Sequence, residues 1–237
     1  MPIKKYNKKD KTKKKTYKLK PKVKKAIKIM LITLCFAILV AVGIFCGKVF
    51  GVIKDAKLGI ENFVIKNENS ILKDKDGIVI ATLTGDENRE IISISEMSPY
   101  LPKAFVAIED ERFYKHGGVD IKRTFAATVK YALSKIGIGS ASYGGSTITQ
   151  QLVKNATKEK DRTWERKVKE MARAYYLEEQ MSKDQILEQY LNLIYLGGNT
   201  FGVEIASNYY FSKSAKELNL AEASFLAGIN NSPENYN

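Results

Sequence analysis

Three carboxylates stand side by side at positions 109–111, directly after the apolar run 104–108. The apolar run predicts a helix, and acids are unfavourable at a helix C-terminus because the helix dipole repels them. A catalytic site that needs a carboxylate base would explain this cluster. An exposed acidic turn paired with Arg112 and Lys115 would explain it equally well, so composition alone leaves both interpretations open.

The segment 144–155, with the sequence GGSTITQQLVKN, is the second place where residue types suggest binding. Two glycines let backbone come close to a ligand, and hydroxyls, amides and an ammonium then follow along a predicted helix start. A helix N-terminus offers free N–H groups and partial positive charge to an anion. A capped surface helix with a polar first turn is the alternative interpretation.

A third group of charges lies in the predicted amphipathic helix 165–181, where Arg166 and Glu170 stand four residues apart. Taken alone, this spacing favours an exposed ion pair worth roughly 0.2–0.5 kcal/mol. His116, the single histidine, follows a predicted helix stop and can hydrogen-bond locally, which favours a structural role.

These residues are positioned by a region that the sequence predicts to be mainly α. A small β-hairpin around Asp76-Gly77 and a further strand precede the helices. Capping boxes mark the starts of the last two helices. The hairpin is predicted at 71–84 and the strand at 90–94; helices are predicted at 102–114, 119–136, 165–181 and 220–229, with another beginning at Ser182.

The positive charge of the chain belongs to one segment. The net charge of the 237 residues is +13. Residues 1–28 contain 14 lysines and one acid, a net charge of +13, so the remaining 25 bases and 25 acids balance. A lysine-rich tail of low hydrophobicity is disordered in isolation. The charge therefore gives no support for a nucleic-acid-binding domain.

An uncharged run at 29–47 lies between Lys28 and Lys48. As a helix it would be about 29 Å long, which matches the hydrocarbon core of a bilayer. It has no polar face, as a buried core helix would, and no A-x-A cleavage site follows it, as after a signal peptide. We interpret it as an uncleaved single-pass anchor, and the positive-inside rule places the basic tail 1–28 in the cytoplasm.

The cysteine and histidine content limits the possible metal and disulfide sites. Cys35 and Cys46 both lie in the predicted anchor, about 16 Å apart along a helix, which is too far for a disulfide. No other cysteine and only one histidine occur, so a zinc site built mainly from these residues is excluded.

Five motifs appear in order over residues 95–237 and resemble the signatures of the peptidoglycan glycosyltransferase family. This is the lysozyme-like domain of bifunctional penicillin-binding proteins and monofunctional transglycosylases. One short motif is weak evidence, but five in sequence are specific. The motifs are Glu109-Asp110-x-x-Phe113-x-x-His116-x-Gly118, Gly144-Gly145-Ser146-x-Ile148-Thr149-Gln150-Gln151-x-x-Lys154-Asn155, Arg166-Lys167-x-x-Glu170-x-x-x-Ala174, Lys183-x-x-Ile186-Leu187-x-x-Tyr190-Leu191-Asn192-x-x-Tyr195-x-Gly197, and Leu220-Ala221-Glu222-Ala223-x-x-Leu226-Ala227-Gly228 with Ser232-Pro233.

The resemblance implies a two-lobed, lysozyme-like glycosyltransferase domain at 95–237, preceded by a juxtamembrane connector and hairpin at 48–94. Domains of this family usually continue with further helix, so we expect this one to be incomplete at its C-terminus. The location implied is the bacterial cell membrane, with the domain outside the cytoplasm. The chain would be part of a bifunctional penicillin-binding protein or a monofunctional transglycosylase.

The reaction implied by the resemblance is polymerisation of lipid II, with inversion and release of polyprenyl diphosphate. Glu109 would be the base for the sugar 4-hydroxyl and Glu170 the second catalytic carboxylate. Fixed positive charge would stabilise the leaving diphosphate. The expected substrate-binding residues are Asp110, Arg112, Ser146, Gln150, Gln151, Lys154, Arg162, Arg166 and Lys169.

The partners implied are lipid II, the growing glycan chain and the membrane, with cell-wall synthesis proteins as candidates. No cofactor is required; a divalent cation, Mg²⁺ or Mn²⁺, on the diphosphate is compatible with the chemistry, although the sequence shows no ligand set for it. Two other functions stay open: a lysozyme-like hydrolase, which would share the carboxylates, and an inactive membrane scaffold. The lysine and amides of 144–155 favour a phosphorylated donor over the hydrolase.

Overall fold

The computed structural model describes residues 20–56, 70–73, 75–76, 79–83, 88–139, 144–159, 161 and 163–236. Most of the predicted basic tail, part of the connector and Arg162 lie outside this part of the chain. The chain divides into two units, residues 1–48 and 49–237, which are described separately.

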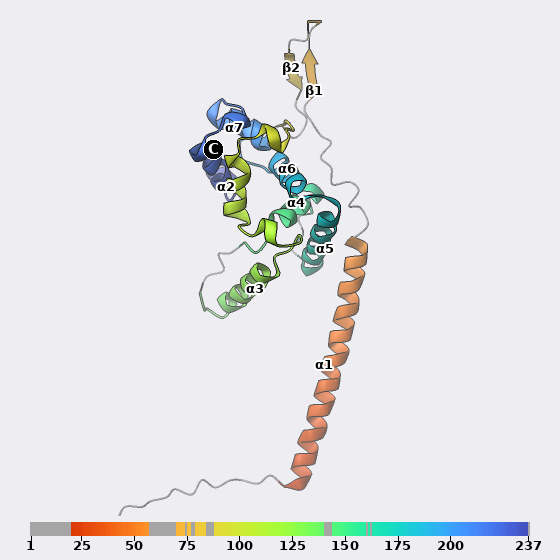
Figure 1. Cartoon of the computed structure of the whole chain (residues 1–237). Coiled ribbons are helices and arrows are strands. Elements are labelled where there is room, and N and C mark those ends of the chain that lie inside the picture. The colour runs from red at the N-terminus through yellow and green to blue at the C-terminus, as the bar shows by residue number, and fades with distance from the viewer. Residues whose placement is uncertain are drawn as a thin grey trace, which may run out of the picture. The chain divides into compact units, whose positions relative to one another are not determined.

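Helix α1, Pro21–Ala56, contains the apolar run predicted to be an anchor (Figure 1). Its side chains are exposed along nearly the whole length of the helix. It is longer than the predicted span because the flanking lysines are good helix formers and continue the helix on both sides. Within the described residues it is the one helix whose length and composition suit a membrane span.

In the second unit the predicted hairpin is confirmed. Strand β1, Ser70–Lys73, pairs antiparallel with β2, Val79–Leu83, and the register shifts at Leu72/Lys73. The further strand predicted at 90–94 is wrong. A two-residue strand, β3 (Asn88–Arg89), instead pairs in parallel with β4 (Thr200–Phe201), and residues 94–96 form a 3₁₀ turn.

The remainder of the unit is helical, so the mainly α prediction is confirmed. Helices α2 and α8 pack against each other, and α4 packs against both α5 and α6. Figure 1 shows this group of short helices in green to blue. The helices are α2 (Tyr100–Glu109), α3 (Ile121–Lys135), α4 (Ile148–Thr157), α5 (Trp164–Gln180), α6 (Lys183–Leu193), α7 (Val203–Phe211) and α8 (Leu220–Ile229).

The core that holds these helices is apolar and fully buried. Its largest members come from α2, the turn after α2, α4, α6, the segment after α6, and α8, so helices that contribute to the site rest on one common core. They are Leu101, Phe105, Phe113, Ile148, Leu152, Ile186, Leu187, Tyr190, Leu191, Ile194, Leu196 and Leu226.

Helix α2 ends five residues earlier than the predicted end at 114. Asp110 leaves the helix with φ −156° and ψ 72°, and a short 3₁₀ turn, Phe113–Lys115, follows. This break lets the Asp110 carboxylate accept hydrogen bonds from other segments. The boundary was missed because these partners are distant in the sequence.

Candidate active site

The described residues form an open cleft of about 1040 Å³ beside the end of α2 and the outer face of α4. Four of the predicted site residues line it: Glu109, Gln151, Lys154 and Arg166. They come from three different helices, α2, α4 and α5. The cleft therefore brings a carboxylate, an amide and two cations together.

Glu109 is half-buried at the last position of α2, and both of its carboxylate oxygens accept hydrogen bonds. Gln151 Nε2 donates to Oε2 at 2.7 Å, and Asn230 Nδ2 donates to Oε1 at 2.9 Å. Both donors are neutral amides. The carboxylate is therefore held by its neighbours while its negative charge faces the cleft.

Tyr190 connects the two amides. Its hydroxyl donates to Gln151 Oε1 at 3.2 Å and accepts from Asn230 Nδ2 at 3.0 Å. Burial, and then the charge of Glu109, raise the pKa of the Tyr190 phenol far above its usual range. The phenol therefore stays protonated and acts as a fixed donor.

Helix α4 presents one polar face to the cleft and one buried face to the core. Thr147 caps it in a capping box with Gln150, in which the Gln150 N–H donates to Thr147 Oγ1 and the Thr147 N–H donates to Gln150 Oε1. Gln151 and Lys154, three residues apart, lie on the cleft face, and the Lys154 side chain is exposed. The predicted ligand-binding helix start is thus a well-capped helix.

Glu170 is only 3% exposed. The prediction that it forms an exposed ion pair with Arg166 is therefore wrong, because the carboxylate is buried. Arg166 Nη1 donates to Glu170 Oε2 at 2.6 Å, and Lys167 Nζ donates to Oε1. Gln150 Nε2 reaches the same Oε1 at 3.4 Å. Lys167 also donates to Ser146 Oγ at 2.8 Å, so one buried carboxylate fixes two cations and the loop before α4.

Asp110, next to Glu109 in the chain, has no exposed surface. Its Oδ2 accepts from the Ile148 backbone N–H at 3.1 Å, at the first turn of α4. The same oxygen lies 2.9 Å from His116 Nε2, and the histidine side chain is 5% exposed. Asp110 therefore ties the end of α2 to the start of α4, with His116 beside it.

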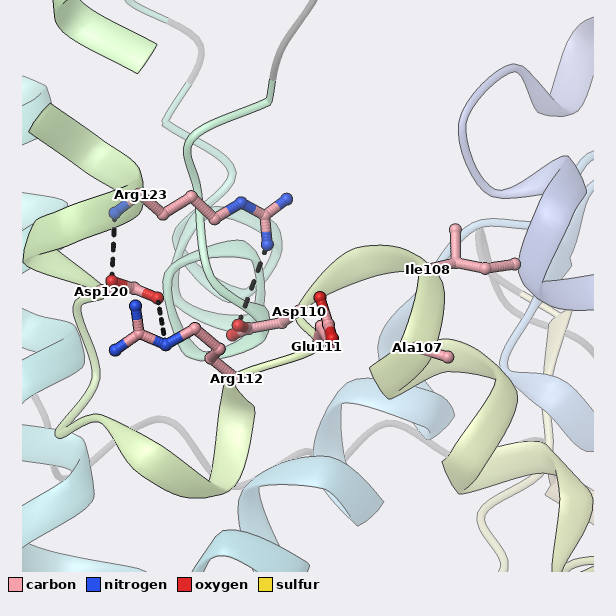
Figure 2. Close-up of a pocket in the computed structure, with 7 residues that line it drawn as sticks. All are labelled: Ala107, Ile108, Asp110, Glu111, Arg112, Asp120 and Arg123. Carbon is pink, nitrogen blue, oxygen red and sulfur yellow. Dashed lines mark hydrogen bonds and ion pairs between the residues drawn. The ribbon is translucent and has the colours of Figure 1, made fainter. Parts of the chain in front are cut away.

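A smaller pocket of about 380 Å³ is lined in part by Asp110 (Figure 2). Asp110 and Asp120 face it, and Figure 2 shows each aspartate paired with an arginine. Arg123 Nη1 lies 3.8 Å from Asp110 Oδ1, and Arg112 Nε lies 3.5 Å from Asp120 Oδ2. This pocket, and not the cleft, holds the predicted site residue Arg112.

Arg123 links three segments near the cleft. Its guanidinium donates to the backbone carbonyl of Glu109 and, through Nε, to the carbonyl of Gly144 at 3.2 Å. Its own N–H donates to Asp120 Oδ1 at 3.1 Å, which caps α3. One side chain on α3 therefore holds the end of α2 and the loop before α4 in place.

Comparison with known proteins identifies the family of the chain. The family model described as "Transglycosylase" matches residues 76–237. The chain belongs to the transglycosylase family. The matched range includes the residues that line the cleft and the buried hydrogen bond between Asp110 and the Ile148 N–H.

Several curated relatives carry penicillin-binding protein names. The chain is 43% identical over 212 residues to "Penicillin-binding protein 1A" of Clostridium botulinum strain Langeland, covering 89% of this chain and 26% of the relative. It is 42% identical over 176 residues to "Penicillin-binding protein 1F" of Bacillus subtilis strain 168, covering 74% of this chain and 24% of the relative. The chain thus spans about a quarter of the length of these relatives.

The cleft is not lined by every predicted site residue. Ser146, Gln150 and Glu170 lie one layer behind it, connected to Arg166 and Lys167. Asp110 and Arg112 line the smaller pocket. Lys169 is half-buried on α5 and lines neither cavity, and Arg162 lies outside the described residues.

Several residues that contact the predicted site, among them Lys167, Asn230 and Arg123, were not predicted to belong to it. Lys167 could have been found from its place in the third motif, three residues before Glu170. Asn230 and Arg123 contact Glu109 from positions 121 and 14 residues away, and no local pattern marks them. The described residues contain no group of three or more His, Cys, Asp or Glu side chains that could hold a metal ion.

Proposed function

We propose that this chain is a peptidoglycan glycosyltransferase that polymerises lipid II into glycan strands. The observation that carries the proposal is one cleft that presents Glu109, held by neutral amides, together with Lys154 and Arg166. A base and fixed cations are the two requirements of sugar transfer from a diphosphate donor. Membership of the transglycosylase family supports the same reaction.

In the proposed reaction the sugar 4-hydroxyl of the acceptor attacks C1 of the growing chain. A C–O bond forms at C1 with inversion, and the bond from C1 to the diphosphate oxygen breaks. Glu109 takes the hydroxyl proton, because a sugar hydroxyl is a poor nucleophile near neutral pH. The electron pair leaves with polyprenyl diphosphate, whose charge the site must stabilise.

The cations of α4 and α5 stabilise the leaving diphosphate in this proposal. Lys154 reaches the cleft directly, and Arg166 reaches it while bonded to Glu170. Glu170 and Ser146 then act by orienting cations, since Glu170 accepts from Arg166 and Lys167 and Ser146 accepts from Lys167. Gln150 acts one step further away, by donating to Glu170. Gln151 both holds Glu109 and lines the cleft.

The remaining predicted substrate-binding residues have different positions and therefore different proposed roles. Asp110 has no exposed surface, which favours a positioning role for it over substrate contact. Arg112 is placed to meet a part of the substrate that extends into the smaller pocket. Arg162 and Lys169 would add electrostatic attraction for the diphosphate through their positive charge.

We propose the membrane as the second partner. Helix α1 would anchor the chain, with the lysine-rich tail in the cytoplasm and the cleft outside. Helix α3 and the turn after it expose an apolar set of side chains that suits the bilayer surface and the polyprenyl chain. These side chains are Ile121, Phe125, Val129, Tyr131, Leu133, Ile136 and Ile138.

The proposal is tested by incubating the detergent-solubilised chain with labelled lipid II. Glycan polymer and polyprenyl diphosphate should appear together, with one diphosphate released for each glycosidic bond formed. A hydrolase would instead release reducing ends from preformed glycan without any diphosphate, and a scaffold would bind lipid II without turnover. Either of the last two results would overturn the proposal. We propose cell-wall synthesis proteins as further partners.

A further inference from the structure

Asn230 is the residue immediately after α8, and its side-chain amide lies between two groups of the site. Nδ2 donates to Glu109 Oε1 at 2.9 Å and to the Tyr190 hydroxyl at 3.0 Å. Helix α8 packs along α2, which ends at Glu109, so the two helices deliver the amide and the carboxylate to the same place.

We propose that Asn230 is a positioning residue that sets the orientation of the Glu109 carboxylate through a directed ring of hydrogen bonds with Tyr190 and Gln151. The inference rests on the proposed role of Glu109 as the base. Asn230 is not one of the charged residues of the motifs. Its contact with Glu109 can be measured separately from catalysis.

The direction of every bond in the ring follows from chemistry. A carboxylate in this role only accepts, so Gln151 and Asn230 must both turn their NH₂ groups toward Glu109. The Gln151 carbonyl then faces Tyr190, whose hydroxyl must donate to it. The Tyr190 oxygen is left to accept from Asn230, and no member of the ring can reverse without breaking two bonds.

The ring rests on rigid structure. Tyr190 has no exposed surface, and its aromatic ring packs edge-to-face on Phe105 of α2 with centroids 6.2 Å apart. The raised pKa of Tyr190 keeps its proton in place as a donor. Because Tyr190 cannot rotate away, the two amides and the carboxylate share one fixed geometry.

The ring also leaves Glu109 able to act. Each carboxylate oxygen can accept about two hydrogen bonds, and within the described part of the chain each accepts one. A second acceptor position on each oxygen is therefore available to an incoming hydroxyl. Loss of Asn230 would free the carboxylate to rotate, which lowers the rate of proton transfer without removing a diphosphate contact.

The test compares Asn230→Ala with Asn208→Ala in lipid II polymerisation. Asn208 is a matched control, because its exposed side chain also donates through Nδ2 to a carboxylate, that of the buried Glu204 of α7, at 3.1 Å, and neither residue lines the cleft. We expect Asn230→Ala to lower kcat by about 10- to 100-fold with KM within about threefold. We expect Asn208→Ala to stay within about twofold of the parent.

A second variant gives a readout that a merely structural role would not move. Asn230→Asp places another carboxylate beside Glu109, and two such carboxylates titrate as a coupled pair. The acid limb of the kcat/KM profile should therefore move to higher pH by about one unit or more. An unmoved limb, a loss no greater than that of Asn208→Ala, or a loss confined to KM would overturn the inference.

A contact measurement separates this inference from the proposed function. In the intact chain labelled with ¹⁵N-asparagine, the Asn230 side-chain signal is the one missing from Asn230→Ala. It should shift when Glu109 is replaced by Gln, even if the parent makes no polymer. A parent without polymer contradicts the proposed function alone, whereas an unshifted Asn230 signal overturns the positioning role whatever the activity.

Discussion

Glu109 and Glu170 occupy neighbouring parts of the same helical unit, but opposite kinds of donor surround them. Two neutral amides hold Glu109 at the edge of the cleft. Arg166, Lys167 and one amide hold Glu170, which is 3% exposed. Within the described residues, Glu109 has no ion pair and Glu170 has two.

This difference indicates what each carboxylate can do. Glu109 keeps an uncompensated negative charge toward the cleft, as a base for a hydroxyl proton requires. The charge of Glu170 is matched by two cations, so it acts through the positions of those cations. In the proposed reaction, the two glutamates predicted to be catalytic from the motifs therefore have different roles, Glu109 as the base and Glu170 as a positioning residue.

The largest effect is expected from Glu109→Gln. It keeps the shape of the side chain but removes the proton acceptor, so the rate of polymerisation should fall by at least about 10²-fold. The thermal unfolding temperature should change little, because the Glu109 side chain is only half-buried. Glu111→Gln, two residues away and exposed, is the control and should retain most of the parent rate.

Glu170→Gln should have the next largest effect, through a different route. Arg166 and Lys167 lose the carboxylate that holds them, so kcat/KM should fall by about 10- to 100-fold. Breaking this partly exposed pair should also lower the free energy of unfolding by about 1–3 kcal/mol. If Glu170→Gln lost as much polymerisation activity as Glu109→Gln and lost no stability, the contrast between the two glutamates would be removed.

Lys154→Ala tests the cationic wall of the cleft. The side chain is exposed at the cleft, so its removal should leave folding intact. The rate should fall by about 10-fold, with a weaker dependence on salt concentration, because the salt-screened attraction between the Lys154 ammonium and the diphosphate is lost. Lys122→Ala, an exposed lysine on α3, is the charge-matched control.

A smaller effect is expected at Asp120, and it concerns stability. Burial works to raise the pKa of Asp120, but the Arg123 backbone N–H and the Arg112 guanidinium together hold it below its usual range. A depressed carboxyl pKa stabilises the fold above about pH 4 and loses that contribution as pH falls through the folded pKa. Asp120→Asn should therefore cost about 1 kcal/mol at pH 7, and the cost should shrink as pH falls through the folded pKa.

That stability difference can be measured by urea unfolding at several pH values, using the fluorescence of Trp164, the single tryptophan of the chain. A penalty for Asp120→Asn that grows as pH falls would contradict the assignment of its partners.

The smallest effect is expected from chelation. Side-chain cations already face the cleft, so EDTA should lower the polymerisation rate by less than about threefold. A complete loss restored by Mg²⁺ or Mn²⁺ would show that a divalent cation on the diphosphate carries the charge instead.

Local patterns in the sequence were sufficient for much of the fold. The capping boxes at Ser182 and Asn219 mark the starts of α6 and α8, and both are present. The hairpin and α3 also follow from local periodicity and turn residues. The motifs located Glu109, Gln151, Lys154 and Arg166, which the structure brings to one cleft.

Contacts between distant segments could not be predicted in the same way. Asn230 meets Glu109 across 121 residues, and Asp110 meets the N–H of Ile148 across 38. Glu170 stands on a helix face that looks exposed by its charges, yet Lys167 and Gln150 cover it. In each case tertiary packing, which local sequence does not encode, decides the role of the residue.

The central claim is that Glu109 removes the acceptor proton and Glu170 does not. The most direct test measures lipid II binding and a single turnover in parallel for Glu109→Gln and Glu170→Gln. The account predicts that Glu109→Gln binds lipid II with nearly the affinity of the parent but releases almost no polyprenyl diphosphate, whereas Glu170→Gln binds it more weakly and still turns over. Release of diphosphate by Glu109→Gln at the rate of the parent would contradict the claim.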